Sequence, residues 1–588
     1  MKTILAYLLF SFSLVSYAQE SEVKWWNPVD HTFPVIEGQA WAGEVKGDYD
    51  RLPARAEGKV RDAVYNLGTQ SAGLMIRFRT NATGISIKYK VKNRNNFALT
   101  HMPATGVSGL DLYVIDSDGQ ELWAAGKRSF GDTVTYHFEG LASDANYHNL
   151  GNEYRLYLPL YNSVEWLQIG VGREFNFEPL PIRKEKPIVV YGTSIAQGAC
   201  ASRPGMAWTA ILSRKIDRPL INLGFSGNGI LEIPVIDLVA EIDAKLFVLD
   251  CLPNLIGLDI SDSKLKEIIT KAVKRLRSMR IETPILLVDH AGYTEGLVSP
   301  KRKSSYERVN RVQSEAYYDL VRDGLQGLYY LSHKDLNIQL DDMVDGVHPN
   351  DLGMAHYAES YESKLRTILQ EPIGDISTTQ PVIQCREPGN YNWDERHREI
   401  LDLNKNDPSK TIIFANSIVH FWGGKPSSKI ARDKESWDAI LTPAGVSNYA
   451  YGWDRIENVL WRVYHGELDG FNAERILVMI GTNNLHLNTD SEIREGLSLL
   501  VRAIKVRQPE AEIVLMGLLP RRDYEPRIKL LNNDLAKIAS NQQVKFTDLG
   551  HVFLKETGLV NETYFSDGLH PNKAGYEELI RVLAPLIR

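Results

Sequence analysis

The sequence predicts an α/β protein in which a β-sandwich precedes two three-layer α/β/α domains. Short runs of alternating polar and apolar residues, broken by Gly, Asn and Asp, fill residues 19–184, as in antiparallel strands. From residue 185 uniformly apolar runs alternate with helical stretches, which indicates parallel strands covered by helices on both faces. The motif Asp-Gly-x-His-Pro-Asn occurs at 345–350 and again at 567–572, so we expect this α/β unit twice.

The composition is that of a globular protein too long for a single core. Of the 588 residues, 43% are hydrophobic and 24% are charged, and a chain of this length divides into several domains. The formal net charge of −7 is spread without long runs of one sign. This leaves no electrostatic footprint for nucleic acid or for an anionic membrane, and we expect neither as a partner.

The first residues have the pattern of a secretory signal peptide. Lys2 precedes an apolar stretch at 4–15, and small residues lead to a cleavage site after Ala18. The alternative, an N-terminal membrane anchor, needs a longer apolar run to span a bilayer. We therefore expect residues 1–18 to be removed and the mature protein to have no integral membrane segment. Its expected location is periplasmic or secreted.

The β-sandwich is expected over 19–184, with typical strands such as 84–89. Trp25, Trp26 and Trp41 have flat faces that suit sugar rings, but tryptophan is more often a packing residue, which is the interpretation we favour. The loop at 101–106 is expected to lean over the catalytic end of the next domain.

The two α/β/α domains are expected over 185–370 and 409–588, joined by a linker at 371–408 that ends in a short helix. Strands are predicted at 187–191, 219–223, 245–249 and 284–289, and then at 411–415, 475–480 and 512–517. Helices are predicted near 206–216, 262–279, 303–323 and 351–369, and then near 454–464, 491–506, 526–540 and 573–587. Active sites of such sheets lie at the carboxyl ends of the strands.

The first domain carries a candidate nucleophile and base at these ends. Asp345 precedes His348 by three residues, so its carboxylate can hold one imidazole nitrogen and leave the other free as a base. Ser194 follows an apolar strand and is the candidate nucleophile. An oxyanion needs donors that are already aimed at it. Gly227, whose backbone can approach closely, and the amide of Asn254 fit that need.

The ordered blocks that hold these residues resemble those of SGNH hydrolases, also called GDSL-type, over about 185–370. The blocks are Gly192-Thr193-Ser194, 224–228, 250–254 and 345–348. The resemblance implies a flavodoxin-like fold and a serine that attacks an ester carbonyl. Thr193 stands where the family usually has aspartate. The nearby Arg203 could contact substrate or form a structural ion pair. Residues 109–113, Gly-Leu-Asp-Leu-Tyr, resemble the signature of a domain that precedes some secreted SGNH esterases.

The second domain is similar to the catalytic subunit of intracellular platelet-activating-factor acetylhydrolase and its bacterial relatives. The matching blocks are 458–462, 481–484, 517–521 and 567–570. The resemblance implies that Ser417 is the nucleophile, that Asn483 is an oxyanion donor, and that Asp567 and His570 form the base pair.

Two departures from that family affect the second site. Asn416 replaces the usual aspartate before the serine. The glycine that provides a backbone oxyanion donor aligns with Trp453, while a glycine stands one position earlier at Gly452. Either Trp453 or Gly452 could therefore supply the N–H group.

Cys200 and Cys251 both flank the first site, and Cys385 lies in the linker. In an export compartment Cys200 and Cys251 could form a disulfide, although two buried thiols are the simpler alternative.

Together these patterns predict a serine esterase with two active sites and no need for a cofactor or a metal. Export would place it among polysaccharides, so we expect it to remove O-acetyl groups from an acetylated polysaccharide or oligosaccharide. One alternative is a lipid or phospholipid acyl esterase. Another is a glycan-binding protein with only one active hydrolase domain.

Overall fold

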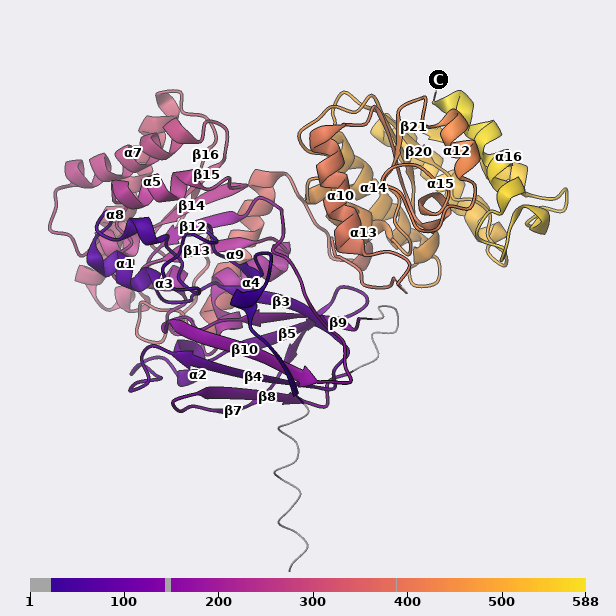
Figure 1. The fold of residues 1–588 in the computed structure, drawn as a ribbon. Coiled ribbons are helices and arrows are strands. Elements are labelled where there is room, and N and C mark those ends of the chain that lie inside the picture. Colours follow the sequence, from indigo (N-terminus) through magenta and orange to yellow (C-terminus); the bar gives the residue numbers. More distant parts are fainter. Residues whose placement is uncertain (1–22, 143–149, 388, 588) are drawn as a thin grey trace, which may run out of the picture. The chain divides into compact units, whose positions relative to one another are not determined.

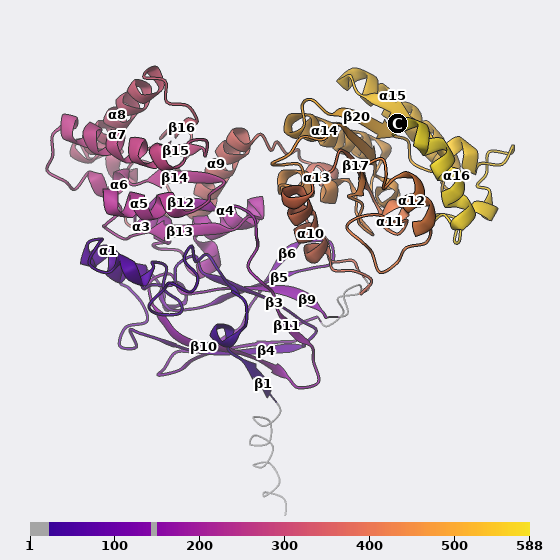
Figure 2. The same ribbon diagram turned by 45° about the horizontal axis from the view of Figure 1, so that its top comes forward.

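The computed structural model describes residues 23–142, 150–387 and 389–587, so the predicted signal peptide lies outside the described residues. The chain divides into two compact units, one holding most residues up to Leu365 and the other holding all residues from Arg366 together with the short segment Asp116–Gln120. Within the described ranges, no helix combines the length and the apolar character that a membrane crossing requires. Figures 1 and 2 show the elements of both units.

The N-terminal part of the first unit is a pair of antiparallel sheets. One sheet has the order β1-β10-β4-β8-β7, with strands Val23–Trp26, Val164–Gly172, Gly84–Val91, Val134–Glu139 and Lys127–Ser129. The other has the order β11-β3-β9-β5-β6, with strands Phe177–Pro179, Met75–Thr80, Asn152–Tyr157, Asp111–Ile115 and Glu121–Ala124, and β2 (Ile36–Glu37) pairs with β3. Alternate residues of β4 are buried in the core between the sheets, as the polar and apolar alternation predicts. The short helices α1 (Asp62–Gly68) and α2 (Ala104–Val107) interrupt the strands.

The tryptophans of this part take packing roles. Trp41 is buried and donates a hydrogen bond to Glu241 across 2.8 Å. Trp26 packs on Phe177 with ring centroids 5.3 Å apart. The half-buried Trp25 lies under the Lys88 ammonium. The three rings therefore do not form a common platform for sugar.

The rest of the first unit is a parallel sheet between helices. The order is β13-β12-β14-β15-β16, with strands Leu220–Gly224, Ile188–Gly192, Leu246–Asp250, Ile285–Val288 and Leu328–Leu331. The helices are α3 (Ser194–Gln197), α4 (Trp208–Ile216), α5 (Ile233–Glu241), α6 (Leu252–Leu255), α7 (Asp262–Met279), α8 (Pro300–Arg322) and α9 (Asp351–Leu369). In both views helices lie on either side of the sheet (Figures 1 and 2).

The sandwich and this sheet share one core. Trp41, Leu52 and Val64 belong to the same buried cluster as the strands β12 and β14. The buried Arg51 donates hydrogen bonds to the carbonyls of Asn222 and Gly224 across 3.0 and 2.8 Å. Because Gly224 is the last residue of β13, the sandwich supports the start of the loop that follows this strand.

The second unit repeats the parallel sheet. Its order is β18-β17-β19-β20-β21, with strands Val446–Asn448, Thr411–Ala415, Arg475–Met479, Glu512–Met516 and Lys545–Thr547. Its helices are α10 (Trp393–Asn406), α11 (Ser417–His420), α12 (Lys434–Ile440), α13 (Ile456–Tyr464), α14 (Asp490–Arg507), α15 (Glu525–Gln542) and α16 (Lys573–Leu583). The predicted short linker helix is the first half of α10, whose Trp393 is buried. The predicted fold class is confirmed.

Short 3-10 helices complete the described chain. They are η2 (Pro28–Asp30), η3 (Ala54–Ala56), η4 (Pro204–Met206), η5 (Thr294–Leu297), η6 (Ser377–Thr379), η7 (Thr482–Asn484), η8 (Gly550–Phe553), η9 (Glu562–Tyr564) and η10 (Ala584–Leu586). Cys200 and Cys251 are buried thiols and form no disulfide. The Cys251 thiol instead lies 3.6 Å from the Tyr191 carbonyl inside the sheet.

Candidate active sites

In the first site the candidate nucleophile begins a helix directly after a buried strand. β12 ends at Gly192 and α3 starts at Ser194, which is 8% exposed. Between them, the Thr193 hydroxyl accepts a hydrogen bond from the Ile195 N–H across 3.3 Å and caps the helix. Aspartate is an equally good cap. The exchange of aspartate for Thr193 therefore keeps the local structure that presents the serine.

Serine, histidine and aspartate of the first site form a continuous chain of hydrogen bonds. Ser194 Oγ lies 2.9 Å from His348 Nε2, and His348 Nδ1 lies 2.8 Å from Asp345 Oδ2. Asp345 Oδ1 also accepts the backbone N–H groups of Val347 and His348. Burial raises the pKa of Asp345, but these hydrogen bonds outweigh it and leave the pKa below its ordinary value. The ionised carboxylate can hold the tautomer that leaves Nε2 free to take the serine proton.

The predicted oxyanion donors of this site lie in the segments that follow β13 and β14. Gly227 is exposed and has a φ of +68°, a left-handed conformation that suits glycine. Asn254 lies on α6, and its Oδ1 accepts the Gly229 N–H across 3.0 Å. Because the oxygen is occupied in this way, the Asn254 amide group is left to donate.

Gln197, which the sequence analysis missed, orients the loop that carries Gly227. Its buried side chain accepts the Ser226 N–H across 3.0 Å through Oε1 and donates to the Leu160 carbonyl across 3.1 Å. The N–H of Ser226 is thereby occupied, and the next N–H, that of Gly227, remains for an oxyanion. A polar residue within the otherwise apolar turn after Ser194 was the available signal, since buried amides are hydrogen-bonded.

The loop predicted to lean over the first site does reach it. The imidazole of His101 stacks against that of His348, with ring centroids 5.8 Å apart and an interplanar angle of 28°. The buried Met102 and a 2.6 Å hydrogen bond from the Thr105 hydroxyl to the Ser202 carbonyl hold the loop in place. The β-sandwich therefore contributes one wall of this site.

The second site has the same chain of hydrogen bonds. Ser417 Oγ lies 2.8 Å from His570 Nε2, and His570 Nδ1 lies 2.7 Å from Asp567 Oδ2. Burial raises the pKa of Asp567, but hydrogen bonds from the backbone and side chain of His570 lower it to about 2. Asn416 caps α11 by accepting the Ile418 N–H across 3.0 Å, as Thr193 does for α3. Asn416 therefore caps the helix in place of the aspartate that is usual at this position.

The choice between Gly452 and Trp453 follows from their hydrogen bonds. The Gly452 N–H donates to Nδ1 of the buried His420 across 2.9 Å, so it is not available to an oxyanion. Trp453 has a φ of +61°, the conformation that Gly227 has in the first site. His420 follows Ser417 by three residues, as Gln197 follows Ser194, and both accept the N–H before the donor position. Of the two candidates, only Trp453 has its N–H left for the oxyanion.

Asn483, the other predicted donor, lies on η7 after β19. Its amide nitrogen donates one hydrogen bond to the Asp454 carbonyl across 2.9 Å. An amide carries two N–H groups, so the second remains for an oxyanion. All predicted residues of each site thus lie at the carboxyl end of the corresponding sheet, with each serine bonded to its histidine.

The sequence comparisons identify both domains. Residues 185–366 and 416–578 match the GDSL-like Lipase/Acylhydrolase family, and residues 23–177 match the N-terminus of Esterase_SGNH_hydro-type proteins. The platelet-activating factor acetylhydrolase IB subunit alpha2 of Bos taurus is 31% identical over 207 residues, which cover 34% of this chain and 85% of that protein. This chain belongs to the GDSL-like lipase/acylhydrolase family. It is a carboxylic ester hydrolase with tandem SGNH domains.

Further relatives agree with this assignment. The platelet-activating factor acetylhydrolase IB subunit alpha1 of Homo sapiens is 27% identical over 204 residues, 34% of this chain and 84% of that protein. A crystal structure of a GDSL-like lipase from Bacteroides ovatus has 32% identity and a TM-score of 0.53, and the match covers 59% of this chain and 98% of that one.

Arg203 of this SGNH hydrolase forms a structural ion pair, one of the two roles considered for it from the sequence. Its guanidinium pairs with the buried Asp111 and lies over the Trp123 ring. Asp111 is the aspartate of the Gly-Leu-Asp-Leu-Tyr signature, and it also accepts the Gly205 N–H across 3.0 Å. The signature therefore joins the sandwich to the segment that follows the first nucleophile.

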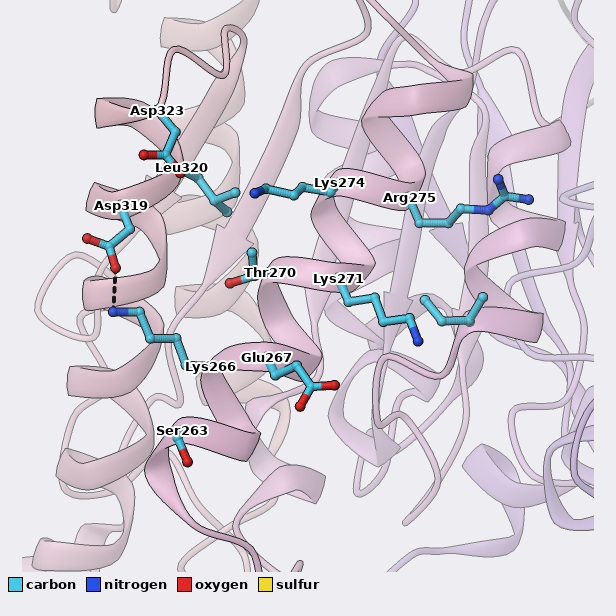
Figure 3. A pocket seen from close by; sticks show the side chains of 11 residues that line it. Ser263, Lys266, Glu267, Thr270, Lys271, Lys274, Arg275, Asp319, Leu320 and Asp323 are labelled. Atoms are coloured by element: carbon cyan, nitrogen blue, oxygen red, sulfur yellow. Dashed lines mark ion pairs between the residues drawn. The ribbon is translucent and has the colours of Figure 1, made fainter.

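A groove on the helical face of the first SGNH domain lies outside both sites. Most of its lining side chains come from α7 and α8, and they include Leu320 as well as Lys266 and Asp319, which form an ion pair (Figure 3). None of the predicted site residues is among those that line it. Across the described ranges, no group of three or more His, Cys, Asp and Glu side chains is arranged to hold a metal ion.

Proposed function

We propose that this esterase acts outside the cytoplasm and removes O-acetyl groups from polysaccharides, with one active site in each SGNH domain. The observation that carries the proposal is the pair of Ser–His–Asp hydrogen-bond chains, each of which has donors for an oxyanion beside its serine.

The proposed reaction has two steps at each site. In the first site Ser194 Oγ attacks the ester carbonyl while His348 Nε2 takes its proton. The N–H groups of Ser194 and Gly227 and the Asn254 amide would bind the oxyanion. The protonated His348 then gives its proton to the leaving sugar hydroxyl, and an acyl-enzyme remains. Water, deprotonated by the same histidine, releases acetate.

The second site would follow the same steps with its own groups. Ser417 attacks, His570 moves the proton and Asp567 orients the imidazole. The N–H of Trp453 and the amide of Asn483 take the places of Gly227 and Asn254.

The choice of acetyl and of glycan has two supports. Two relatives are named as acetylhydrolases, which favours a small acyl group. The signal peptide predicted at 1–18 favours a substrate outside the cytoplasm, where polysaccharides are abundant. A lipid or phospholipid acyl esterase is the alternative, and it requires a long apolar groove beside the serine. A glycan-binding protein with one active domain is the other alternative.

Acetate release tests the proposal. Wild type, Ser194→Ala, Ser417→Ala and the double variant are compared on acetylated xylan, acetylated pectin and acetylated peptidoglycan. Each single variant should lose the substrates of its own site, and the double variant should release none. A double variant as active as wild type would refute the mechanism. A single variant that loses all activity would show that only the altered site acts on these substrates.

A further inference from the structure

The two sites differ in the charges that surround them. Two arginines, both half-buried, flank the second site. Arg432 Nη1 lies 3.3 Å from the Ser566 hydroxyl, which in turn donates to the His570 carbonyl. Arg521 Nη1 donates to the Thr482 carbonyl across 3.1 Å, one residue before Asn483. One arginine thus borders the base and the other borders the oxyanion donor.

Neither arginine is neutralised by a neighbour. Among the described residues, no carboxylate lies within 4.0 Å of the guanidinium nitrogens of Arg432 or Arg521. Other arginines of this unit do have such partners: Arg462, Arg475, Arg494, Arg507, Arg522, Arg527 and Arg581. A guanidinium has five N–H donors, and the hydrogen bonds above use one on each arginine. Most of these donors therefore have no hydrogen-bond partner among the described residues, although the Arg521 guanidinium also lies over the Tyr524 ring, 4.8 Å from its centroid.

The effect of the two charges reaches the catalytic histidine. Burial lowers the pKa of His570, Asp567 opposes this, and Arg432 and Arg521 lower the pKa further. Both guanidiniums therefore lie close enough to interact electrostatically with His570. This agrees with the contacts on either side of the site.

The first site has a different charge pattern. The arginine beside its oxyanion loop, Arg61, pairs with Glu232 across 2.8 Å and donates to the Asn228 side chain across 2.8 Å. Its charge is thus compensated within the protein. The imidazole of His101, not an arginine, covers the base of this site.

We propose that the second site is specific for acetyl esters on acidic sugar residues, whose carboxylate Arg432 and Arg521 bind, and that the first site takes neutral acetylated sugars. Guanidinium groups bind carboxylates through paired N–H donors, which fix both position and orientation. Two unpaired arginines beside one serine suit such a substrate, since burying them against a neutral ligand leaves their charges uncompensated. This proposal rests on the glycan esterase function proposed above.

The test uses acetylated oligogalacturonate and the same oligosaccharide with its carboxylates converted to methyl esters. Acetate release is measured in the Ser194→Ala background, in which only the second serine can act. The readout is the ratio of kcat/KM for the acidic substrate to kcat/KM for the methyl ester. Arg432→Gln and Arg521→Gln should each lower this ratio about tenfold, as the loss of a charge-assisted hydrogen bond does.

A third arginine provides the matched control. Arg502 is exposed on α14 and contacts the Ser498 hydroxyl at 3.1 Å, away from the site. Arg502→Gln should leave the ratio unchanged. Added salt should lower the ratio for the parent protein and not for the two site variants, because it screens exposed charges. Unfolding temperatures identify variants that fail to fold. For such a variant we use Arg→Lys in place of Arg→Gln, because lysine keeps the charge and lacks the paired N–H donors.

Each result decides the matter. Equal kcat/KM for the two substrates in the Ser194→Ala background, or a ratio that the Arg432 and Arg521 variants do not change, would overturn the acidic specificity while the glycan function stands. If neither oligosaccharide nor acetylated xylan releases acetate while 4-nitrophenyl acetate is hydrolysed, the glycan function itself fails, and this proposal with it. If the arginine variants instead reduce acetate release from an anionic acetylated lysophospholipid, the second site is a lipid esterase.

Discussion

The hydrogen bond from Gly452 to His420 can be tested as the feature that sets up the second oxyanion site. His420→Leu removes the Nδ1 acceptor and replaces the buried imidazole by an apolar side chain of similar size. An unsatisfied buried N–H costs about 1–3 kcal/mol. The loop can avoid this cost by rotating the Tyr451–Gly452 peptide, and we expect this rotation to displace the next peptide, which carries the Trp453 N–H and whose carbonyl accepts hydrogen bonds from Gln384 and Tyr391. Loss of one oxyanion donor lowers kcat by about 10² to 10³ in a comparable serine hydrolase. The same factor is the largest loss of kcat that we expect for His420→Leu.

The matched variant comes from the first site. His420→Gln restores an acceptor of the kind that Gln197 provides to Ser226. In the Ser194→Ala background, with kcat and KM measured on one acetyl ester, the leucine variant should lose kcat and keep its KM. The glutamine variant should retain kcat within about tenfold, since its acceptor can hold the same N–H. A leucine variant that folds and keeps the parent kcat would refute the role given to His420.

Three further predictions concern the bases, the caps and the sandwich loop. The lowered pKa of His570 keeps this imidazole neutral at lower pH. In the Ser194→Ala background, the acidic limb of the pH profile of kcat/KM should therefore have its midpoint below about 6.5, the ordinary histidine pKa. A midpoint above that value would contradict the prediction. Thr193→Val should destabilise the protein by about 1 kcal/mol, and Thr193→Asp should not; equal midpoints in urea denaturation would show that the cap contributes nothing. His101→Ala should lower kcat/KM about two- to tenfold in the Ser417→Ala background, and His101→Phe, which keeps a stacked ring, should lower it less; equal values for the two variants would exclude stacking as the cause.

The sequence was most informative where the pattern is local and repeated. The central strands β12, β14, β17 and β19 are uninterrupted apolar runs, and their bounds were predicted to within about a residue. Of the four edge strands of the parallel sheets, β13 was predicted, and β16, β18 and β21 were missed because each has only three or four residues, too few to show a pattern. Their stability comes from pairing with β15, β17 and β20, which is a tertiary effect. Helix α5 was missed because apolar residues occupy most of its surface and leave little periodicity.

The same distinction applies to the active sites. The aspartate and the histidine of each catalytic pair lie three residues apart, so one short motif predicts both. The hydrogen bonds from Ser226 to Gln197 and from Gly452 to His420 join residues 29 and 32 positions apart. No local motif contains both partners of such a bond. The sequence therefore left Gly452 and Trp453 as equal candidates, and the partner of the Gly452 N–H distinguishes them.

The conformation of Trp453 connects the oxyanion loop to specificity. A left-handed φ costs a residue with a side chain about 1–2 kcal/mol relative to glycine, and the first site avoids this cost with Gly227. The backbone N–H alone does not require tryptophan, since glycine donates equally well. The half-buried indole, which meets the Phe421 ring edge-on at 6.5 Å, is therefore the part that glycine cannot supply. In the specificity proposed for the second site, this ring would act together with the two arginines, Arg432 and Arg521. We propose that the two features together favour a small acyl group on an acidic substrate, whereas in the first site Gly227 has no side chain and Arg61 beside its loop is paired with Glu232.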